Sequence, residues 1–131
     1  MSSSDKMVII IEDEPDTAEM YAEMIRISGY EVIKYFAGST AVAQIAEQKP
    51  SAVVLDLMMP DVSGLEVIHF MKKEPHLAEV PVIIVSAKTL PKDIEAGLNA
   101  GATAYLTKPV SFSDLINAIN SAIELKGERK T

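Results

Sequence analysis

The sequence predicts an α/β protein with a doubly wound five-stranded parallel sheet covered by helices on both faces. Short apolar runs alternate five times with segments of helical periodicity. The runs at residues 52–55 and 80–85 are almost continuously apolar, which is typical of strands buried on both faces of a parallel sheet. Because crossovers between parallel strands are right-handed, few topologies remain, and we expect the strand order 2-1-3-4-5.

Glycine and proline mark most boundaries between the predicted elements. The expected strands are residues 7–11, 31–36, 52–55, 80–85 and 104–107. The expected helices begin near Pro15, Ser39 or Thr40, Gly64, Pro91 and Ser111. In the first helix Ala18, Tyr21, Ala22 and Ile25 form the inner face, which we expect Met20, Met24 and Ile27 to widen. We expect Phe112 to lie on the inner face of the last helix.

A chain of 131 residues is long enough for one domain with a full core. We expect a disordered tail at residues 1–6, a folded domain at 7–125 and a polar tail at 126–131. The formal net charge of −7 argues against direct nucleic-acid binding, which needs clustered Lys and Arg. The chain has no cysteine, no apolar stretch of the roughly 18–20 residues that would span a membrane, and no signal-peptide pattern at its start, so we expect a cytoplasmic protein.

Polar residues follow four of the five predicted strands, at the point where each apolar run stops. They are Glu12 and Asp13, Asp56, Ser86 and Lys108. In a doubly wound fold the carboxyl ends of the strands meet at one edge, where functional groups gather. Taken singly, each residue has an ordinary structural explanation, such as a turn cap or a solvated lysine. Their coincidence at one edge predicts a site with three carboxylates, a hydroxyl and an ammonium.

Three neighbouring carboxylates repel one another unless a cation joins them. Oxygen-only ligands suit Mg²⁺, whereas zinc prefers His or Cys; His69 and His76 are expected on the surface. A carboxylate can also accept a phosphoryl group, and the transfer then needs mainly positioning and positive charge. The pattern therefore favours a magnesium-dependent aspartyl phosphate, with Lys108 adding charge and Ser86 donating a hydrogen bond.

In several motifs the sequence resembles the receiver domains of bacterial two-component response regulators. These are Glu12-Asp13-Glu14-Pro15, Leu55-Asp56-Leu57-Met58-Met59-Pro60-Asp61 with Gly64, Ser86-Ala87, and Leu106-Thr107-Lys108-Pro109. The match extends in order from about Lys6 to about Leu125, and together the motifs are highly specific. The resemblance implies a CheY-like, flavodoxin-like (βα)5 fold. It also implies a signalling domain that assists its own phosphorylation and dephosphorylation, rather than an enzyme.

The resemblance further assigns a role to each site residue. Asp56 is the phosphoacceptor, and Lys108 pairs with it once it is phosphorylated. Asp13 and Asp56 coordinate Mg²⁺ directly, the backbone carbonyl of Met58 is a third protein ligand, and Glu12 acts through water. Glu12 departs from the more usual Asp and lengthens the arm towards the metal.

The resemblance also implies how phosphorylation is read by partners. Ser86 and Tyr105 form a switch pair that repacks the face made by the fourth helix, fifth strand and fifth helix. The Lys108–Pro109 peptide bond is expected to be cis. The expected partners are a sensor histidine kinase or phosphotransfer protein and a downstream protein. The charged residues that join winged-helix regulators into dimers are replaced by residues 102–104 and Ala118, so we expect a monomer or a weak phosphorylation-dependent homodimer.

Two other classes of function remain open from the sequence. A receiver-like scaffold or dimerisation module would not depend on phosphorylation, and the complete set of acidic, hydroxyl and lysine residues argues against it. A flavodoxin-like redox protein is suggested by the fold alone. Its first loop would have to bind the cofactor phosphate, which Glu12, Asp13 and Glu14 would repel.

Overall fold

The computed structural model describes residues 6–130, except for the side chains of residues 127–130. Five parallel strands form one sheet in the order β2-β1-β3-β4-β5, which confirms the predicted fold class and strand order. The strands are β1 (Met7–Ile11), β2 (Glu31–Tyr35), β3 (Ala52–Leu55), β4 (Val82–Ser86) and β5 (Ala104–Thr107). The helices are α1 (Pro15–Ile27), α2 (Gly38–Ile45), α3 (Gly64–Lys73), α4 (Pro91–Ala100) and α5 (Phe112–Lys130).

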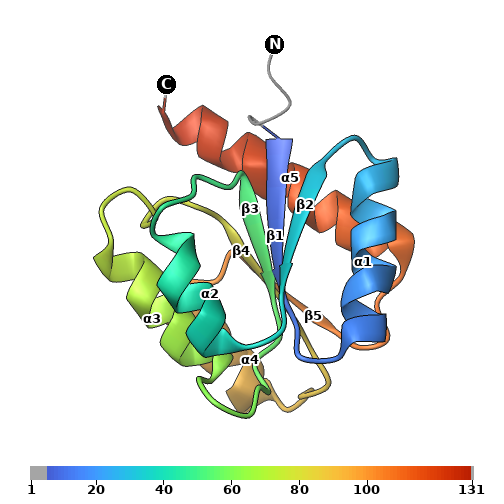
Figure 1. Cartoon of the computed structure of the whole chain (residues 1–131), viewed down its shortest axis with the longest axis vertical. Helices are drawn as coiled ribbons and strands as arrows, with labels where there is room; N and C mark the ends of the chain where they lie inside the picture. The colour runs from blue at the N-terminus through green and yellow to red at the C-terminus, as the bar shows by residue number, and fades with distance from the viewer. Residues whose placement is uncertain (1–5, 131) are drawn as a thin grey trace.

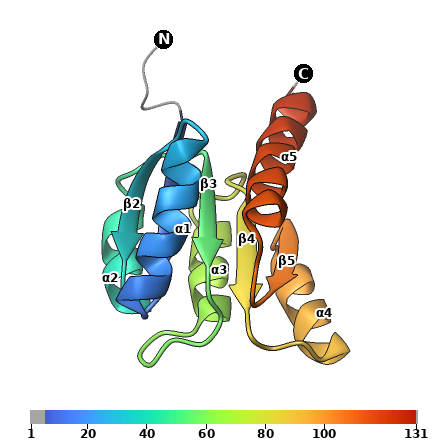
Figure 2. The same cartoon turned by 90° about the vertical axis from the view of Figure 1, so that its right-hand side faces the viewer.

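The helices cover the sheet in two layers, with α1 and α5 on one face and α2, α3 and α4 on the other (Figures 1 and 2). Successive residues of a strand point to opposite faces, so β1 contributes Val8 and Ile10 to the core under α1 and α5. It contributes Ile9 and Ile11 to the core on the other side. All four side chains are fully buried, as a central parallel strand requires.

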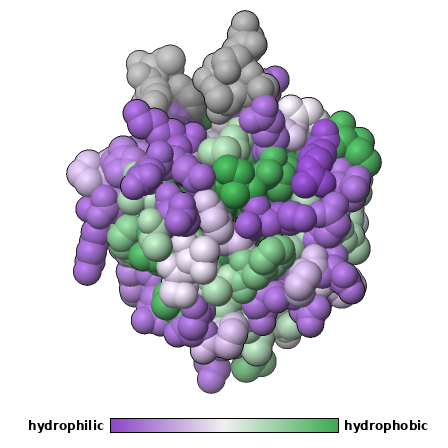
Figure 3. All heavy atoms as spheres, viewed as in Figure 1, coloured by the Kyte–Doolittle hydropathy of each residue, from purple (hydrophilic) through white to green (hydrophobic). Residues whose placement is uncertain are grey.

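One face of the molecule is largely polar. On the face shown in Figure 3, hydrophilic side chains predominate and apolar ones lie in small patches. Within residues 6–130, no helix is long and apolar enough to cross a membrane. The side chains of His69 and His76 are exposed, as expected, and His76 makes a hydrogen bond to the carbonyl of Ala46.

Three apolar residues that we expected to be buried are instead exposed. Met20 and Ile27 of α1 expose 48% and 75% of their surface, and Phe112 of α5 exposes 44%. The buried stripe of α1 is the narrower set Ala18, Tyr21, Ala22 and Ile25. These residues follow the i, i+3, i+4, i+7 spacing of one helix face, and Met20 and Ile27 fall outside it.

Several element boundaries also differ from the prediction. Strand β2 ends at Tyr35 rather than Phe36, because its pairing with β1 stops at Tyr35, and β4 ends at Ser86 rather than Val85, because Ser86 still pairs with Thr107. The fourth strand begins at Val82 rather than Val80, because the intervening Pro81 has no N–H to donate to the sheet. Helix α2 begins at Gly38, so its N-cap is Ala37 rather than Ser39 or Thr40. Alanine has no side-chain acceptor, and the first N–H groups of α2 bond to Asp61 of a distant loop instead. In α5, by contrast, Ser111 accepts a hydrogen bond from the N–H of Asp114, as predicted.

The expected tails fall at the limits of the described chain. Residues 1–5 of the expected N-terminal tail lie outside the described residues, as does residue 131. Helix α5 continues to Lys130, so residues 126–130 of the expected C-terminal tail belong to its last turns.

Candidate functional site

The polar residues predicted from the strand ends lie at one edge of the sheet. Glu12 and Asp13 follow β1 directly, Asp56 follows β3, Ser86 is the last residue of β4, and Lys108 follows β5. Because β1, β3, β4 and β5 are neighbours in the sheet, the order of the strands brings these residues together although up to 96 positions separate them.

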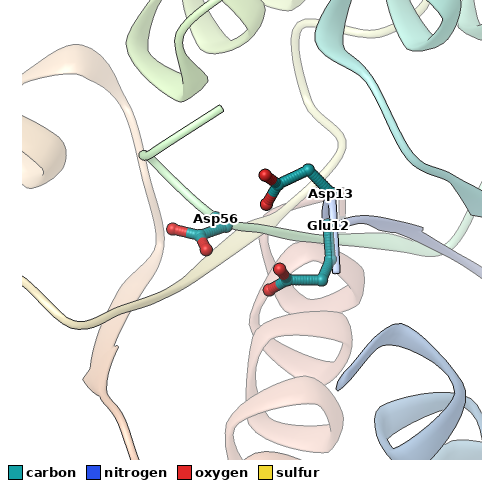
Figure 4. Close-up of side chains that lie close together, drawn as sticks. All are labelled: Glu12, Asp13 and Asp56. Atoms are coloured by element: carbon teal, nitrogen blue, oxygen red, sulfur yellow. The ribbon is translucent and has the colours of Figure 1, made fainter. Parts of the chain in front are cut away.

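Three carboxylates form the centre of the site. Oxygen atoms of Glu12, Asp13 and Asp56 all lie within 4.8 Å of one another. In Figure 4 the carboxyl groups of Glu12 and Asp13 extend towards the side on which Asp56 lies. Glu12 exposes only 2% of its surface and Asp56 only 6%, whereas Asp13 is more open to solvent. Carboxylates this close and this buried need a cation nearby to offset their repulsion.

Lys108 supplies one fixed positive charge. Its Nζ donates to Oδ2 of Asp56 at 2.9 Å and to Oε1 of Glu12 at 3.1 Å. Burial lowers the pKa of Lys108, but the hydrogen bonds to Asp56 and Glu12 outweigh this effect and raise the pKa above its ordinary value. Lys108 is therefore charged at neutral pH. The Lys108–Pro109 peptide bond is cis, as expected.

Backbone N–H groups hold the two buried carboxylates in place. Glu14 donates its N–H to Oε2 of Glu12 at 3.1 Å, and Met58 donates its N–H to Oδ1 of Asp56 at 3.0 Å. Burial still raises the pKa of Glu12 above its ordinary value, although the bonds to Glu14 and Lys108 lower it. The longer arm of a Glu at this position thus reaches both the loop before α1 and the ammonium of Lys108.

The two expected switch residues meet at the loop after β4. Ser86 is fully buried, and its Oγ accepts a hydrogen bond from the N–H of Lys88 at 3.2 Å. The hydroxyl of Tyr105 donates to the carbonyl of Lys88 at 2.8 Å. Both side chains therefore contact the same backbone segment, so a movement of this loop would change the surroundings of both.

The donor set fits a hard divalent cation. Three carboxylates offer only oxygen, and Mg²⁺ prefers oxygen ligands and retains several waters. The carbonyl of Met58 belongs to the same loop as Asp56, but Met58 itself is half exposed and open to solvent. The two histidines are not members of this carboxylate cluster, so the site lacks the ligands that zinc prefers.

No role was predicted from the sequence for Asp61, which the structure connects to the N-terminus of α2. Its carboxylate accepts hydrogen bonds from the N–H groups of Gly38 and Ser39 and from the hydroxyl of Ser39. The sequence carried no direct signal for this contact. The start of α2 at Gly38, after an alanine that has no side-chain acceptor, is known only from the structure.

Comparisons with known proteins agree with this geometry. The family model of the response regulator receiver domain matches residues 8–120. The chain is 38% identical over 121 residues to the probable transcriptional regulatory protein TcrX of Mycobacterium tuberculosis, covering 92% of this chain and 50% of TcrX. It is 35% identical over 116 residues to the polar-differentiation response regulator DivK of Brucella ovis, covering 88% of this chain and 94% of DivK. The chain thus spans half of one relative and nearly all of the other.

A solved structure with a similar fold contains a metal. It is the receiver domain of the sensor histidine kinase PA1611 from Pseudomonas aeruginosa PAO1, with a magnesium ion coordinated in its active site cleft. The TM-score is 0.84 at 27% sequence identity, and the alignment covers 91% of this chain and 98% of that domain. The matched family model covers residues 8–120, which is most of the chain. The chain therefore belongs to the response regulator receiver domain family of two-component signalling.

Proposed function

We propose that this chain is a phosphoacceptor receiver that takes a phosphoryl group from a histidine kinase or phosphotransfer protein onto Asp56. The observation that carries the proposal is the position of Asp56 between an ammonium group and two further carboxylates. Lys108 Nζ lies 2.9 Å from one oxygen of Asp56, and Glu12 and Asp13 place carboxylate oxygens beside it, in an arrangement that could hold a cation. A single carboxylate in this setting is suited to carry a dianionic group.

The proposed reaction is an in-line transfer between two protein side chains. A carboxylate oxygen of Asp56 attacks the phosphorus of a phosphohistidine on the donor. A P–O bond forms as the P–N bond breaks, and the imidazole nitrogen keeps the electron pair of that bond. Lys108 remains protonated and pairs with an oxygen of the new acyl phosphate, and the buried hydroxyl of Ser86 donates to another.

The cation we expect at this site is Mg²⁺. Glu12, Asp13 and Asp56, with the backbone carbonyl of Met58, are the residues that would hold it, Glu12 through water. When bound, Mg²⁺ neutralises charge that develops on the phosphoryl oxygens. The chain's own contribution is to hold the carboxylates together, through the bonds that Lys108, Glu14 and Met58 make to them.

Phosphorylation is expected to act on partners through the face formed by α4, β5 and α5. Ser86 and Tyr105 both contact the loop at Lys88, which leads into α4, so a phosphoryl group that draws Ser86 would shift this loop and the tyrosine together. Leu90, the N-cap of α4, and Leu98, within α4, expose 54% and 43% of their surface and offer apolar contacts. We infer a downstream protein as the reader, with the chain a monomer or a weak phosphorylation-dependent homodimer.

The expectations about nucleic-acid binding and domain bounds follow from the net charge and from the residues that fold together. A net charge of −7 disfavours direct binding of nucleic acid by this chain, and we propose a cytoplasmic receiver domain spanning residues 7–125. The match covers half of TcrX, so any function of the other half of TcrX has no counterpart in the aligned residues of this chain.

The test is intact-mass spectrometry after incubation with acetyl phosphate, with and without MgCl2. We expect one phosphoryl adduct that needs magnesium and is absent in Asp56→Asn. Asp114→Asn is the matched control, because it also removes one carboxylate but lies at the start of α5, and it should be phosphorylated normally. An adduct that persists in Asp56→Asn would refute the assignment of Asp56. A folded wild type that takes up no phosphoryl group would instead favour the phosphorylation-independent scaffold.

A further inference from the structure

The loop between β3 and α3, residues 56–63, carries the proposed phosphoacceptor and is called the Asp56 loop below. Hydrogen bonds fix both of its ends. At its start, the N–H of Asp56 donates to the carbonyl of Ile11 at 3.0 Å. At its end, Gly64 donates to the carbonyl of Leu57 at 3.1 Å, and Ser63 and Glu66 form a capping box for α3. The segment between these ends includes Met58, whose backbone carbonyl is a proposed metal ligand.

Asp61 anchors the middle of this loop to a different element. One carboxylate oxygen accepts from the N–H groups of Gly38 at 3.2 Å and Val62 at 2.7 Å. The other accepts from the N–H of Ser39 at 3.1 Å and from the hydroxyl of Ser39. Asp61 thereby caps α2 across 22 residues of sequence, in place of the side chain that Ala37 lacks. The bond from the Ser39 hydroxyl, followed by those from backbone N–H groups, lowers the pKa of Asp61 to about 2.

A steric observation indicates the same contact independently. A Cβ atom added to Gly38 would lie 2.5 Å from the carbonyl oxygen of Val62 and 2.8 Å from its Cβ. The first residue of α2 is therefore packed directly against the loop, next to Asp61. Glycine is needed here because any side chain would push the loop and the helix apart.

We propose that Asp61 is a positioning residue that holds the Asp56 loop on α2 and thereby sets the magnesium affinity of the site; this rests on the proposed function. A backbone carbonyl has no rotamers, so the position of the Met58 oxygen depends on the loop that carries it. Mg²⁺ tolerates little departure from octahedral geometry. A loop that can move away from α2 therefore binds the ion less well even when the three carboxylates are intact.

The test compares Asp61→Ala, Asp61→Asn and Ser39→Ala in the full chain, with Mg²⁺ affinity measured by titration calorimetry. Loss of an outer partner of a metal ligand typically costs about 10- to 100-fold in affinity, and Asp61 acts at one remove, so we expect about fivefold for Asp61→Ala. Asp61→Asn keeps one acceptor oxygen and should fall between Asp61→Ala and the wild type. Ser39→Ala removes only the hydroxyl bond and should have the smallest effect.

The matched control is Ser111→Ala, which removes the cap that Asp114 uses in α5 and leaves the Asp61 contact intact. It should lower the urea midpoint as a lost cap does, without changing Mg²⁺ affinity. If Asp61→Ala behaves in the same way, with a lower midpoint and an unchanged affinity, Asp61 is only a helix cap and the positioning role is refuted.

Amide hydrogen exchange separates this proposal from the proposed function. Without magnesium, Asp61→Ala should speed exchange at Ser39 and also at Met58, on the far side of the contact. Unchanged exchange at Met58 would overturn the positioning role, whatever the protein binds. If the wild type binds no magnesium but Asp61→Ala still speeds exchange at both Ser39 and Met58, the proposed metal site is refuted. The link between the loop and α2 then stands.

Discussion

Replacing Lys108 with methionine tests whether its ammonium compensates the buried carboxylates. The substitution keeps an unbranched side chain and removes the charge. Lys108 Nζ lies 2.9 Å from Asp56 and 3.1 Å from Glu12, which expose only 6% and 2% of their surface. Removing one partner of a buried ion pair costs about 3–5 kcal/mol. Because the Lys108 side chain is 26% exposed, water replaces part of the lost interaction, and we expect about 2 kcal/mol at neutral pH.

The loss should depend on pH in a defined direction. Burial raises the pKa of Glu12, so the folded state holds a proton more tightly than the unfolded state, and protonation stabilises the fold as the pH falls towards 4.5. The hydrogen bond from Lys108 opposes this rise, so the pKa of Glu12 should be higher still in Lys108→Met. Because the pKa of Lys108 is raised, the stability that its charge contributes is fully present at neutral pH. That stability is lost only when the pH rises above the ordinary pKa of a lysine. The stability deficit of the variant should therefore shrink as the pH falls from neutral towards the ordinary pKa of a Glu side chain.

Urea unfolding followed by circular dichroism measures the effect, with and without MgCl2. Magnesium should stabilise Lys108→Met more than the wild type, because the ion no longer competes with an ammonium for the same carboxylates. Lys34→Met is the matched control, since Lys34 pairs with the 43% exposed Glu19 at the surface and should cost less than about 1 kcal/mol. Equal losses in the two variants, or a Lys108→Met deficit that neither acid nor magnesium reduces, would refute the reasoning.

Three further substitutions test the packing. Ile10→Ala should lower the free energy of unfolding in urea by about 3 kcal/mol, because Ile10 is fully buried. Ile27→Ala should lower it by less than about 0.5 kcal/mol, because Ile27 is 75% exposed. Similar losses in the two variants would contradict the exposure of Ile27 on α1. A Cβ at Gly97 would lie 2.7 Å from Cδ1 of Ile84 and 3.0 Å from Cδ2 of Tyr105. Gly97→Ala should therefore displace the ring of Tyr105, which would shift the NMR signals of that tyrosine. The variant should not gain the roughly 1 kcal/mol of stability that alanine's helix propensity would otherwise add. An unmoved ring together with a gain in stability would show that this space is free.

Much of the fold could be predicted because strand burial is encoded locally. Four consecutive apolar residues at 52–55, rich in valine and followed closely by Pro60, favour a strand covered on both sides over a buried helix, and all four are buried. The helical segments between the strands then require parallel crossovers, which have one handedness. The candidate site was predictable for a related reason. Each of its polar residues interrupts an apolar run at a strand end, and parallel strands bring such ends to one edge.

The errors arose where burial depends on a neighbour rather than on the local pattern. Met20 and Ile27 are apolar and helical, but the sheet covers only a narrow stripe of α1, so they remain exposed. Ser39 looked like a cap for its own helix from its residue type alone. Its hydroxyl instead bonds to Asp61, because α2 begins one residue before Ser39 and packs on the following loop.

The amino-acid sequence by itself determined the α/β class and the set of polar residues at the carboxyl edge, and it left few strand orders, since these follow from periodicity and chain connectivity. Only the tertiary structure decided how those residues pair. Lys108 bonds to both Asp56 and Glu12, and Asp61 bonds to the N-terminus of α2. Such contacts join residues 22 to 96 positions apart. Their partners are chosen by the distances that the packed sheet and helices impose, and no local pattern in the chain contains that information.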